Sequence, residues 1–214
     1  MKKILSATLS LLLLAGCVHA SGNAEPPEVA GPLPSLAERL QNTVTAEQRK
    51  MIALLPDTIG GLTDKKGVSD YEKNKKGAGY SRLYEGDGKI LTVFIGNENS
   101  FTVKDGVTPE AGDVMQKFLD EFTTYQETGL YRRMKIDDIA EKEMTVGGKT
   151  YAFLRTTVSF EMKGEKKVTY IALIPNEKLL SYIRIRLTYP ASFRAAHLQD
   201  EALKAAMNAV AAVK

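Results

Sequence analysis

Four runs of alternating apolar and polar residues, joined by very short turns, limit the folds open to this chain more than any other feature. The runs cover residues 143–146, 149–162, 166–174 and 179–189. Their connections are Gly147-Gly148, a turn at residues 163–165 and a turn at residues 175–177. A period of two is typical of strands with one buried face, and such short connections join only antiparallel neighbours. The segment therefore predicts an antiparallel meander.

Two amphipathic helices flank this meander in the sequence. Residues 109–128 follow Thr108, a good N-cap, and Pro109, which suits the first helical turn, and they end at Gly129. Apolar residues recur there at spacings of three and four: Val114, Met115, Phe118, Leu119, Phe122 and Tyr125. We interpret this stripe as core packing rather than as a cofactor or partner site. The alanine-rich residues 191–214 predict a C-terminal helix.

The first part of the domain is expected to contain shorter elements. Residues 35–41 predict a short helix, and Thr45 to Gln48 form a capping-box pattern that opens a second helix ending at Pro56. Strands are expected at residues 68–71, 80–84 and 89–95. Helices with one apolar stripe must bury it on the sheet, so the chain predicts an α+β fold with an antiparallel sheet of six to seven strands and flanking helices.

This order of elements resembles the PsbP-like α/β/α sandwich. Within residues 55–95, the stretches Gly60-Gly61-Leu62, Gly79-Tyr80-Ser81 and Leu91-Thr92-Val93-Phe94 look like a group of uncharacterised bacterial secreted proteins. The resemblance carries over no catalytic motif. It implies a role as a binding or assembly accessory, because members of that fold are mostly accessories of this kind.

The N-terminus carries the clearest targeting signal. Lys2 and Lys3 precede an apolar run at residues 4–14, which is shorter than the roughly 20 residues of a membrane-spanning helix. The run closes with Leu14-Ala15-Gly16-Cys17, which resembles the lipobox of bacterial lipoproteins. That resemblance implies that Cys17 is lipidated and becomes the first residue of the mature chain. It also implies an outer-membrane lipoprotein facing the periplasm, because residue 18 is Val rather than Asp.

The predicted organisation is a lipoprotein signal peptide at residues 1–16, a lipidated N-terminus and flexible tether at residues 17–36, and a single α+β domain at residues 37–214. The tether is rich in Pro, Gly and Ala and has no hydrophobic periodicity. Two other interpretations remain open. Cleavage after Ala20 would release a soluble secreted protein that begins at Ser21, and an uncleaved signal would form an anchor.

Composition argues against several classes of function. The chain has 29 Lys and Arg against 26 Asp and Glu, and removal of Lys2 and Lys3 leaves 27 against 26, a net charge of +1. A neutral domain lacks the positive field that nucleic-acid binding requires, so we expect no nucleic-acid partner. The expected partners are the membrane, reached through lipidated Cys17, and another envelope protein.

The sequence predicts no enzyme, no cofactor and no metal site. Two histidines, His19 and His197, and the single Cys17 do not make a Cys/His zinc site. There is no Gly-x-Ser-x-Gly elbow for a hydrolase. The acidic residues between the long helix and the first hairpin lack a glycine-turned calcium loop and are interpreted as a solvated connection; they are Asp137, Asp138, Glu141 and Glu143.

One surface could bind a ligand. Arg184 and Arg186 share a face of their strand, and Arg155 lies on the alternating positions of another strand. If these faces coincide, three guanidiniums lie together and would bind a carboxylate or phosphate, or an acidic partner. The alternative is an outer sheet face whose arginines pair with Glu161 and Glu177. The leading hypothesis is thus a lipid-anchored, non-catalytic accessory, and the second is a periplasmic or secreted domain that binds small anions.

Overall fold

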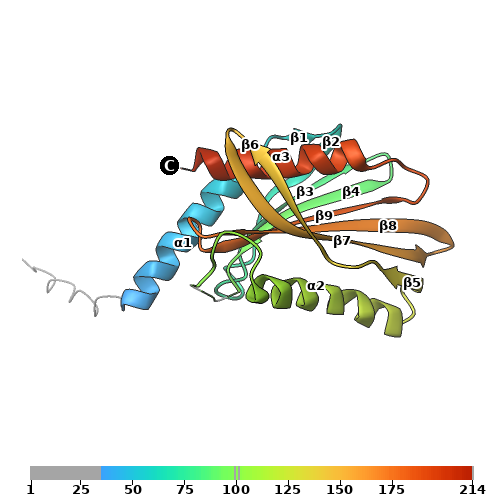
Figure 1. Ribbon diagram of the computed structural model, residues 1–214, viewed down its shortest axis with the longest axis horizontal. Coiled ribbons are helices and arrows are strands. Elements are labelled where there is room, and N and C mark those ends of the chain that lie inside the picture. Colours follow the sequence, from blue (N-terminus) through green and yellow to red (C-terminus); the bar gives the residue numbers. More distant parts are fainter. Residues whose placement is uncertain (1–34, 99, 101, 214) are drawn as a thin grey trace, which may run out of the picture. The chain divides into compact units, whose positions relative to one another are not determined.

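The computed structural model describes residues 35–98, 100 and 102–213 (Figure 1). Within these residues an α+β architecture is confirmed, with one antiparallel sheet and helices on both of its faces. The helices are α1 (Leu36–Ala53), α2 (Pro109–Glu127) and α3 (Ala196–Ala212). The strands are β1 (Thr58–Ile59), β2 (Leu62–Asp70), β3 (Tyr80–Gly86), β4 (Lys89–Gly96), β5 (Arg132–Ile136), β6 (Ala140–Val146), β7 (Lys149–Met162), β8 (Glu165–Asn176) and β9 (Ser181–Pro190).

The nine described strands run in the order β1-β2-β3-β4-β9-β8-β7-β5, and β6 also pairs with β7. The meander predicted from the short turns is confirmed, since β6 to β9 pair with their sequence neighbours. β9 then pairs with β4, which joins the two halves of the chain into one sheet.

Each face of the sheet has its own core. The alternation along β9 sends Ile183, Ile185 and Leu187 into the core beneath α1 and α3. The residues between them face the side of α2, whose stripe of Met115, Leu119 and Phe122 packs on β7 and β8. Figure 1 shows α2 on one side of the sheet and α3 on the other. The stripe on α2 is therefore core, as its spacing predicted.

The number of strands differs from the six to seven expected. β1 and β5 were missed because they have only two and five residues, and β2 begins at Leu62 rather than near Val68. β2 and β5 are largely exposed strands, so the alternation of apolar and polar residues that reveals a half-buried strand is weak in both.

The first helix also differs from the prediction. One helix, α1, replaces the two expected helices, and its capping box lies at Ser35 and Glu38 rather than at Thr45. The Glu38 carboxylate accepts from the Ser35 N–H at 2.7 Å, and the Ser35 hydroxyl accepts from the Glu38 N–H at 3.2 Å. The helix continues past Thr45 because Val44 and Met51 are both buried along it, and Met51 and Ile52 belong to the core on the sheet.

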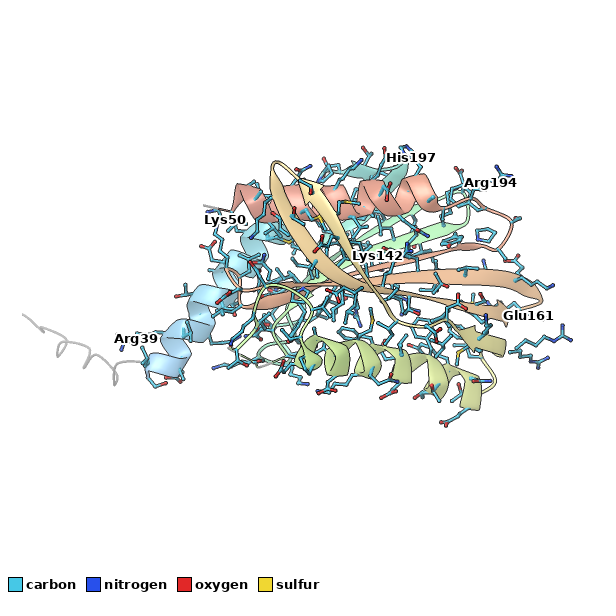
Figure 2. All side chains as sticks on the ribbon, in the orientation of Figure 1. Arg39, Lys50, Lys142, Glu161, Arg194 and His197 are labelled. Atoms are coloured by element: carbon cyan, nitrogen blue, oxygen red, sulfur yellow. The ribbon has the colours of Figure 1, made fainter. Side chains whose placement is uncertain are left out.

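The C-terminal helix is confirmed, but it begins at Ala196 rather than at residue 191. His197 projects outward from it (Figure 2), and its Nε2 lies 3.2 Å from the Glu201 carboxylate one turn later. No helix of the described residues is long and apolar enough to cross a membrane.

Candidate functional site

The register of the sheet separates the three arginines that the sequence placed together. Arg155 lies opposite Ala172, which lies opposite Ile185, so Arg155 faces the side of α1 and α3. Arg184 and Arg186 occupy the alternate positions of β9 and face the side of α2. The expected three-arginine surface is therefore wrong, and only Arg184 and Arg186 form a pair.

The expected acidic partners are also different. Glu161 pairs with Arg133 Nη1 at 3.3 Å, and the ion pair to Arg184 comes from Glu121 on α2 at 3.6 Å. Arg186 has no carboxylate within 4 Å among the described residues. The pair thus carries two positive charges, with one carboxylate, Glu121, within 4 Å and a second, Glu98, close enough to act on the charge of Arg184.

Aromatic rings on α2 and β4 hold the arginine pair in place. The Arg184 guanidinium carbon lies 3.9 Å from the ring centre of Phe118 and 5.0 Å from that of Phe94. The Arg186 carbon lies 4.7 Å from the ring centre of Phe122. A ring over a guanidinium contacts its flat face, so the N–H groups donate in the plane; Arg184 Nη1 already meets Glu121, whereas Arg186 meets no carboxylate within 4 Å among the described residues.

Burial lowers the pKa of the Arg184 guanidinium; Glu121 opposes this shift, and the like charge of Arg186 adds to it. An arginine has so high an ordinary pKa that it stays charged at neutral pH all the same. Placing two cations side by side and partly out of water costs free energy, and an incoming anion would recover part of that cost.

The sheet beside this pair is not covered by a helix. The buried core on the α2 side takes its strand residues from β7, β8 and Tyr182 at the start of β9, and none from β3 or β4. On this side of β3 and β4, Ser81 and Gly96 are buried, but Leu83, Thr92 and Phe94 are only half-buried and Ile90 is 43% exposed. We call this surface the open face; it comprises Leu83, Ile90, Thr92 and Phe94, with Arg184 and Arg186 at its border with α2.

Arg155 is exposed on the other side of the sheet. It lines a cavity near the start of α3, together with Tyr170 and Gln199. Asp137 and Asp138 lie at the same cavity, whereas Glu143 lines a different one. Among the described residues no group of three or more His, Cys, Asp or Glu side chains is arranged to hold a metal ion.

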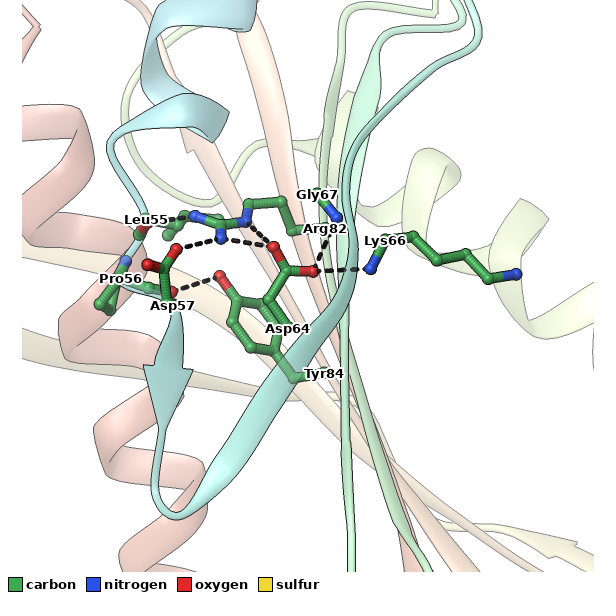
Figure 3. Close-up of polar contacts among 8 residues, drawn as sticks. All are labelled: Leu55, Pro56, Asp57, Asp64, Lys66, Gly67, Arg82 and Tyr84. Carbon is green, nitrogen blue, oxygen red and sulfur yellow. Dashed lines mark hydrogen bonds and ion pairs between the residues drawn. The ribbon is translucent and has the colours of Figure 1, made fainter.

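One buried ionic cluster was missed in the sequence. The Arg82 network, shown in Figure 3, links Arg82 on β3 to three earlier parts of the chain. Arg82 Nε donates to Asp64 Oδ2 at 2.9 Å, Nη2 donates to Asp57 Oδ1 at 2.7 Å, and Nη1 donates to the Leu55 carbonyl. The Tyr84 hydroxyl donates to the Pro56 carbonyl at 2.9 Å, and burial raises the pKa of Tyr84 to about 12.

The Arg82 network is structural rather than a ligand site, because protein oxygens occupy each nitrogen of the guanidinium. It ties the segment between α1 and β1, which holds Leu55 and Asp57, and the strand β2, which holds Asp64, to β3. The sequence carries a signal for this network. Arg82 is two residues from both Tyr80 and Tyr84 on one strand, so its side chain points to the same face as those tyrosines, which lie in the core.

Comparisons with known proteins bear on the N-terminus. Residues 1–17 match the family model of the prokaryotic membrane lipoprotein lipid attachment site. Cys17, the last residue of that match, lies outside the described residues. The match supports the lipoprotein prediction, with a signal peptide, lipid at Cys17 and attachment to the cell envelope.

Comparisons over the length of the chain give less. It matches no curated protein. Among solved structures, the Ran-binding protein Mog1p of Saccharomyces cerevisiae is similar at 13% identity, over 74% of this chain and 92% of that chain, with a TM-score of 0.33. A likeness at this level carries no argument, and the PsbP-like resemblance is not confirmed.

Proposed function

We propose that this protein is a lipid-anchored accessory of the bacterial cell envelope, held at the outer membrane and facing the periplasm, whose domain binds another envelope protein without catalysis. The lipid attachment site at residues 1–17 supports the anchor. The Pro-, Gly- and Ala-rich sequence that follows Cys17 suits a tether between the anchor and the domain.

The arginine pair on the open face carries the binding part of this proposal. Arg186 has no carboxylate within 4 Å among the described residues, and Arg184 shares one, Glu121, at 3.6 Å. The half-buried Leu83 and Phe94 and the exposed Ile90 provide apolar area beside these charges. A protein segment with carboxylates next to apolar side chains matches this surface, because guanidiniums bind carboxylates through two parallel hydrogen bonds.

The anchor is tested by substitution of the lipidated residue. Wild-type protein is expected in the membrane fraction, with a mass equal to residues 17–214 plus acyl chains. Cys17→Ser removes the thiol that carries the lipid, so the protein should lose this modification and leave the membrane fraction. Recovery of wild-type protein without detergent, as a bare chain beginning at Ser21, would contradict the anchor.

The open face is tested by photo-crosslinking in cells. A crosslinking amino acid at Ile90, which is exposed on the open face, should give a discrete adduct with another envelope protein. The same residue at Lys204, exposed on α3 and away from the open face, is the matched control. Arg186→Gln should reduce the Ile90 adduct without lowering the melting temperature. Equal adducts from both positions, or an adduct indifferent to Arg186→Gln, would refute the assignment.

A small-anion receptor is the second candidate, and Arg186, which has no carboxylate within 4 Å among the described residues, favours it. In this version Arg184 and Arg186 hold a phosphate or dicarboxylate, and Arg155 takes no part because it lies on the other side of the sheet. Ligand that binds only the folded state raises the melting temperature. A rise with phosphate or succinate that Arg186→Gln abolishes would favour this candidate over the protein partner.

A further inference from the structure

A small cavity lies at the edge of the sheet, where the partner of β7 changes from β5 to β6. β5 pairs with the second half of β7 and β6 with the first half, so residues 137–139 cross over between them. The crossing is pinned to β7: the Asp137 N–H donates to the Thr157 carbonyl at 2.9 Å, and the Thr156 hydroxyl donates to the Asp137 carbonyl at 2.7 Å. We call the resulting space, of about 240 Å³, the β7 cavity.

The interior of the β7 cavity offers neutral polar groups. The side chain of Tyr170 is 2% exposed, and burial raises the pKa of its hydroxyl, which therefore remains a proton donor at neutral pH. Gln199 reaches the cavity from α3, and its Nε2 donates to the Tyr189 hydroxyl at 3.3 Å. That bond fixes the amide and leaves the side-chain carbonyl of Gln199 to accept from a ligand.

Two opposite charges, Arg155 and Asp138, line the cavity but form no ion pair with each other. Asp137 is occupied, since its carboxylate lies 2.9 Å from Lys135 Nζ and also accepts from the Thr157 hydroxyl. Arg155 and Asp138 both line the same cavity, yet neither has an ion pair within 4 Å among the described residues. A ligand can therefore meet a positive and a negative group of the protein at once.

We propose that the β7 cavity binds a small zwitterion, an α-amino acid or a molecule with the same pair of charged groups. Arg155 binds the carboxylate through two N–H groups, Asp138 binds the ammonium, and Tyr170 and Gln199 contact the polar atoms between them. The chemistry follows from the charges. Asp137, Asp138 and the nearby Asp200 on α3 disfavour a plain anion, and Arg155 disfavours a plain cation.

The size of the β7 cavity agrees with this class of ligand. Its 240 Å³ lies below the range of about 300–1,000 Å³ that is usual for larger organic ligands.

The site is also independent of the proposed function, because it lies on the other side of the sheet from the open face and uses neither Arg184 nor Arg186. Failure of either proposal leaves the other standing.

Three matched ligands separate the alternatives. The mature lipidated protein in a neutral detergent is titrated calorimetrically with L-alanine, with propionate, which lacks the ammonium, and with ethylamine, which lacks the carboxylate. L-Alanine should bind at least about tenfold more tightly than either half-ligand, because only it satisfies both charges. Glycine, L-glutamate and L-lysine extend the series to other side chains.

Variants assign the two charges. Arg155→Gln and Asp138→Asn should each weaken binding of the amino acid about tenfold or more, and both positions are exposed, so the fold should tolerate the changes. Arg133→Gln is the matched control, because Arg133 is exposed on β5 and does not line the cavity. This variant should bind the amino acid as tightly as the wild type. Each of three results would overturn the proposal: propionate binds as tightly as L-alanine, none of the four amino acids binds, or all three variants lose the same amount of amino-acid affinity.

Discussion

Substitution of Arg82 by Met should destabilise the fold more than any other single change to a charged residue of the Arg82 network. The side chain of Arg82 is 7% exposed and that of Asp64 is 10% exposed, so their ion pair is buried. Arg82→Met keeps an unbranched chain in the core but removes every hydrogen bond to Asp64, Asp57 and the Leu55 carbonyl. The Asp64 carboxylate then remains buried without its cation.

The magnitude follows from what remains around Asp64. Removal of one partner of a buried ion pair costs about 3–5 kcal/mol. Asp64 retains hydrogen bonds from the backbone N–H groups of Lys66 at 3.2 Å and Gly67 at 3.0 Å, so the loss should lie near the lower end, about 3 kcal/mol. Asp57→Asn should cost under about 1 kcal/mol, because the Asp57 side chain is 93% exposed and exposed pairs contribute little.

Urea unfolding followed by far-UV circular dichroism measures these differences, with every variant in the same neutral detergent. The double variant Arg82→Met with Asp64→Asn removes the stranded carboxylate, so it should lose less than the sum of the two single variants. A cost below about 1 kcal/mol for Arg82→Met, or strict additivity in the double variant, would refute the view that this pair is buried and coupled.

Three further predictions concern pH, a turn and a helix end. Burial would raise the pKa of Asp64, but the hydrogen bonds from Arg82 and the backbone lower it overall. The ionised Asp64 therefore stabilises the fold fully above its unfolded pKa of about 3.9, and this contribution is lost as pH falls through the folded pKa. Asp64→Asn should flatten that part of the acid-unfolding curve. Gly79→Ala should unfold the β3 end of the sheet, because the φ angle of Gly79 is +74° and a Cβ would lie 1.8 Å from the Ile95 carbonyl oxygen. Gly148 has a φ angle of +80° but open space around it, so Gly148→Ala should lower the melting temperature far less than Gly79→Ala. Thr108→Ala should cost about 1 kcal/mol in urea unfolding through loss of the α2 N-cap, and an unchanged midpoint would contradict that role.

Several elements were predictable because their signals are local. The helix α2 has a cap, a proline at its start and an apolar stripe within 20 consecutive positions, and it was predicted to within one residue at its end. The Gly147-Gly148 hairpin was equally clear, because two adjacent glycines suit the positive φ that a two-residue hairpin turn requires, and both glycines adopt it. Exposed strands such as β5 lack such a signal, because their pairing to β7 is their main constraint.

The arginines show where sequence reasoning stops. The alternation along β9 correctly placed Arg184 and Arg186 on one face. Whether Arg155 shares that face depends on how β7, β8 and β9 are aligned, and a shift of one residue in either turn reverses the answer. The turn between β7 and β8 has two residues between the strands rather than the three expected, and Arg155 therefore faces α3.

The sequence by itself determined the lipid attachment site, the α+β class, the antiparallel meander and the stripe of α2. Each depends on residues that are close together in the chain, so composition and periodicity are enough to reveal it. Only the tertiary structure decided the side of Arg155, the closure of the Arg82 network and the uncovered strands beside the arginine pair. These depend on strand register and on which face each helix covers, and both are set by packing between residues that are distant in the sequence.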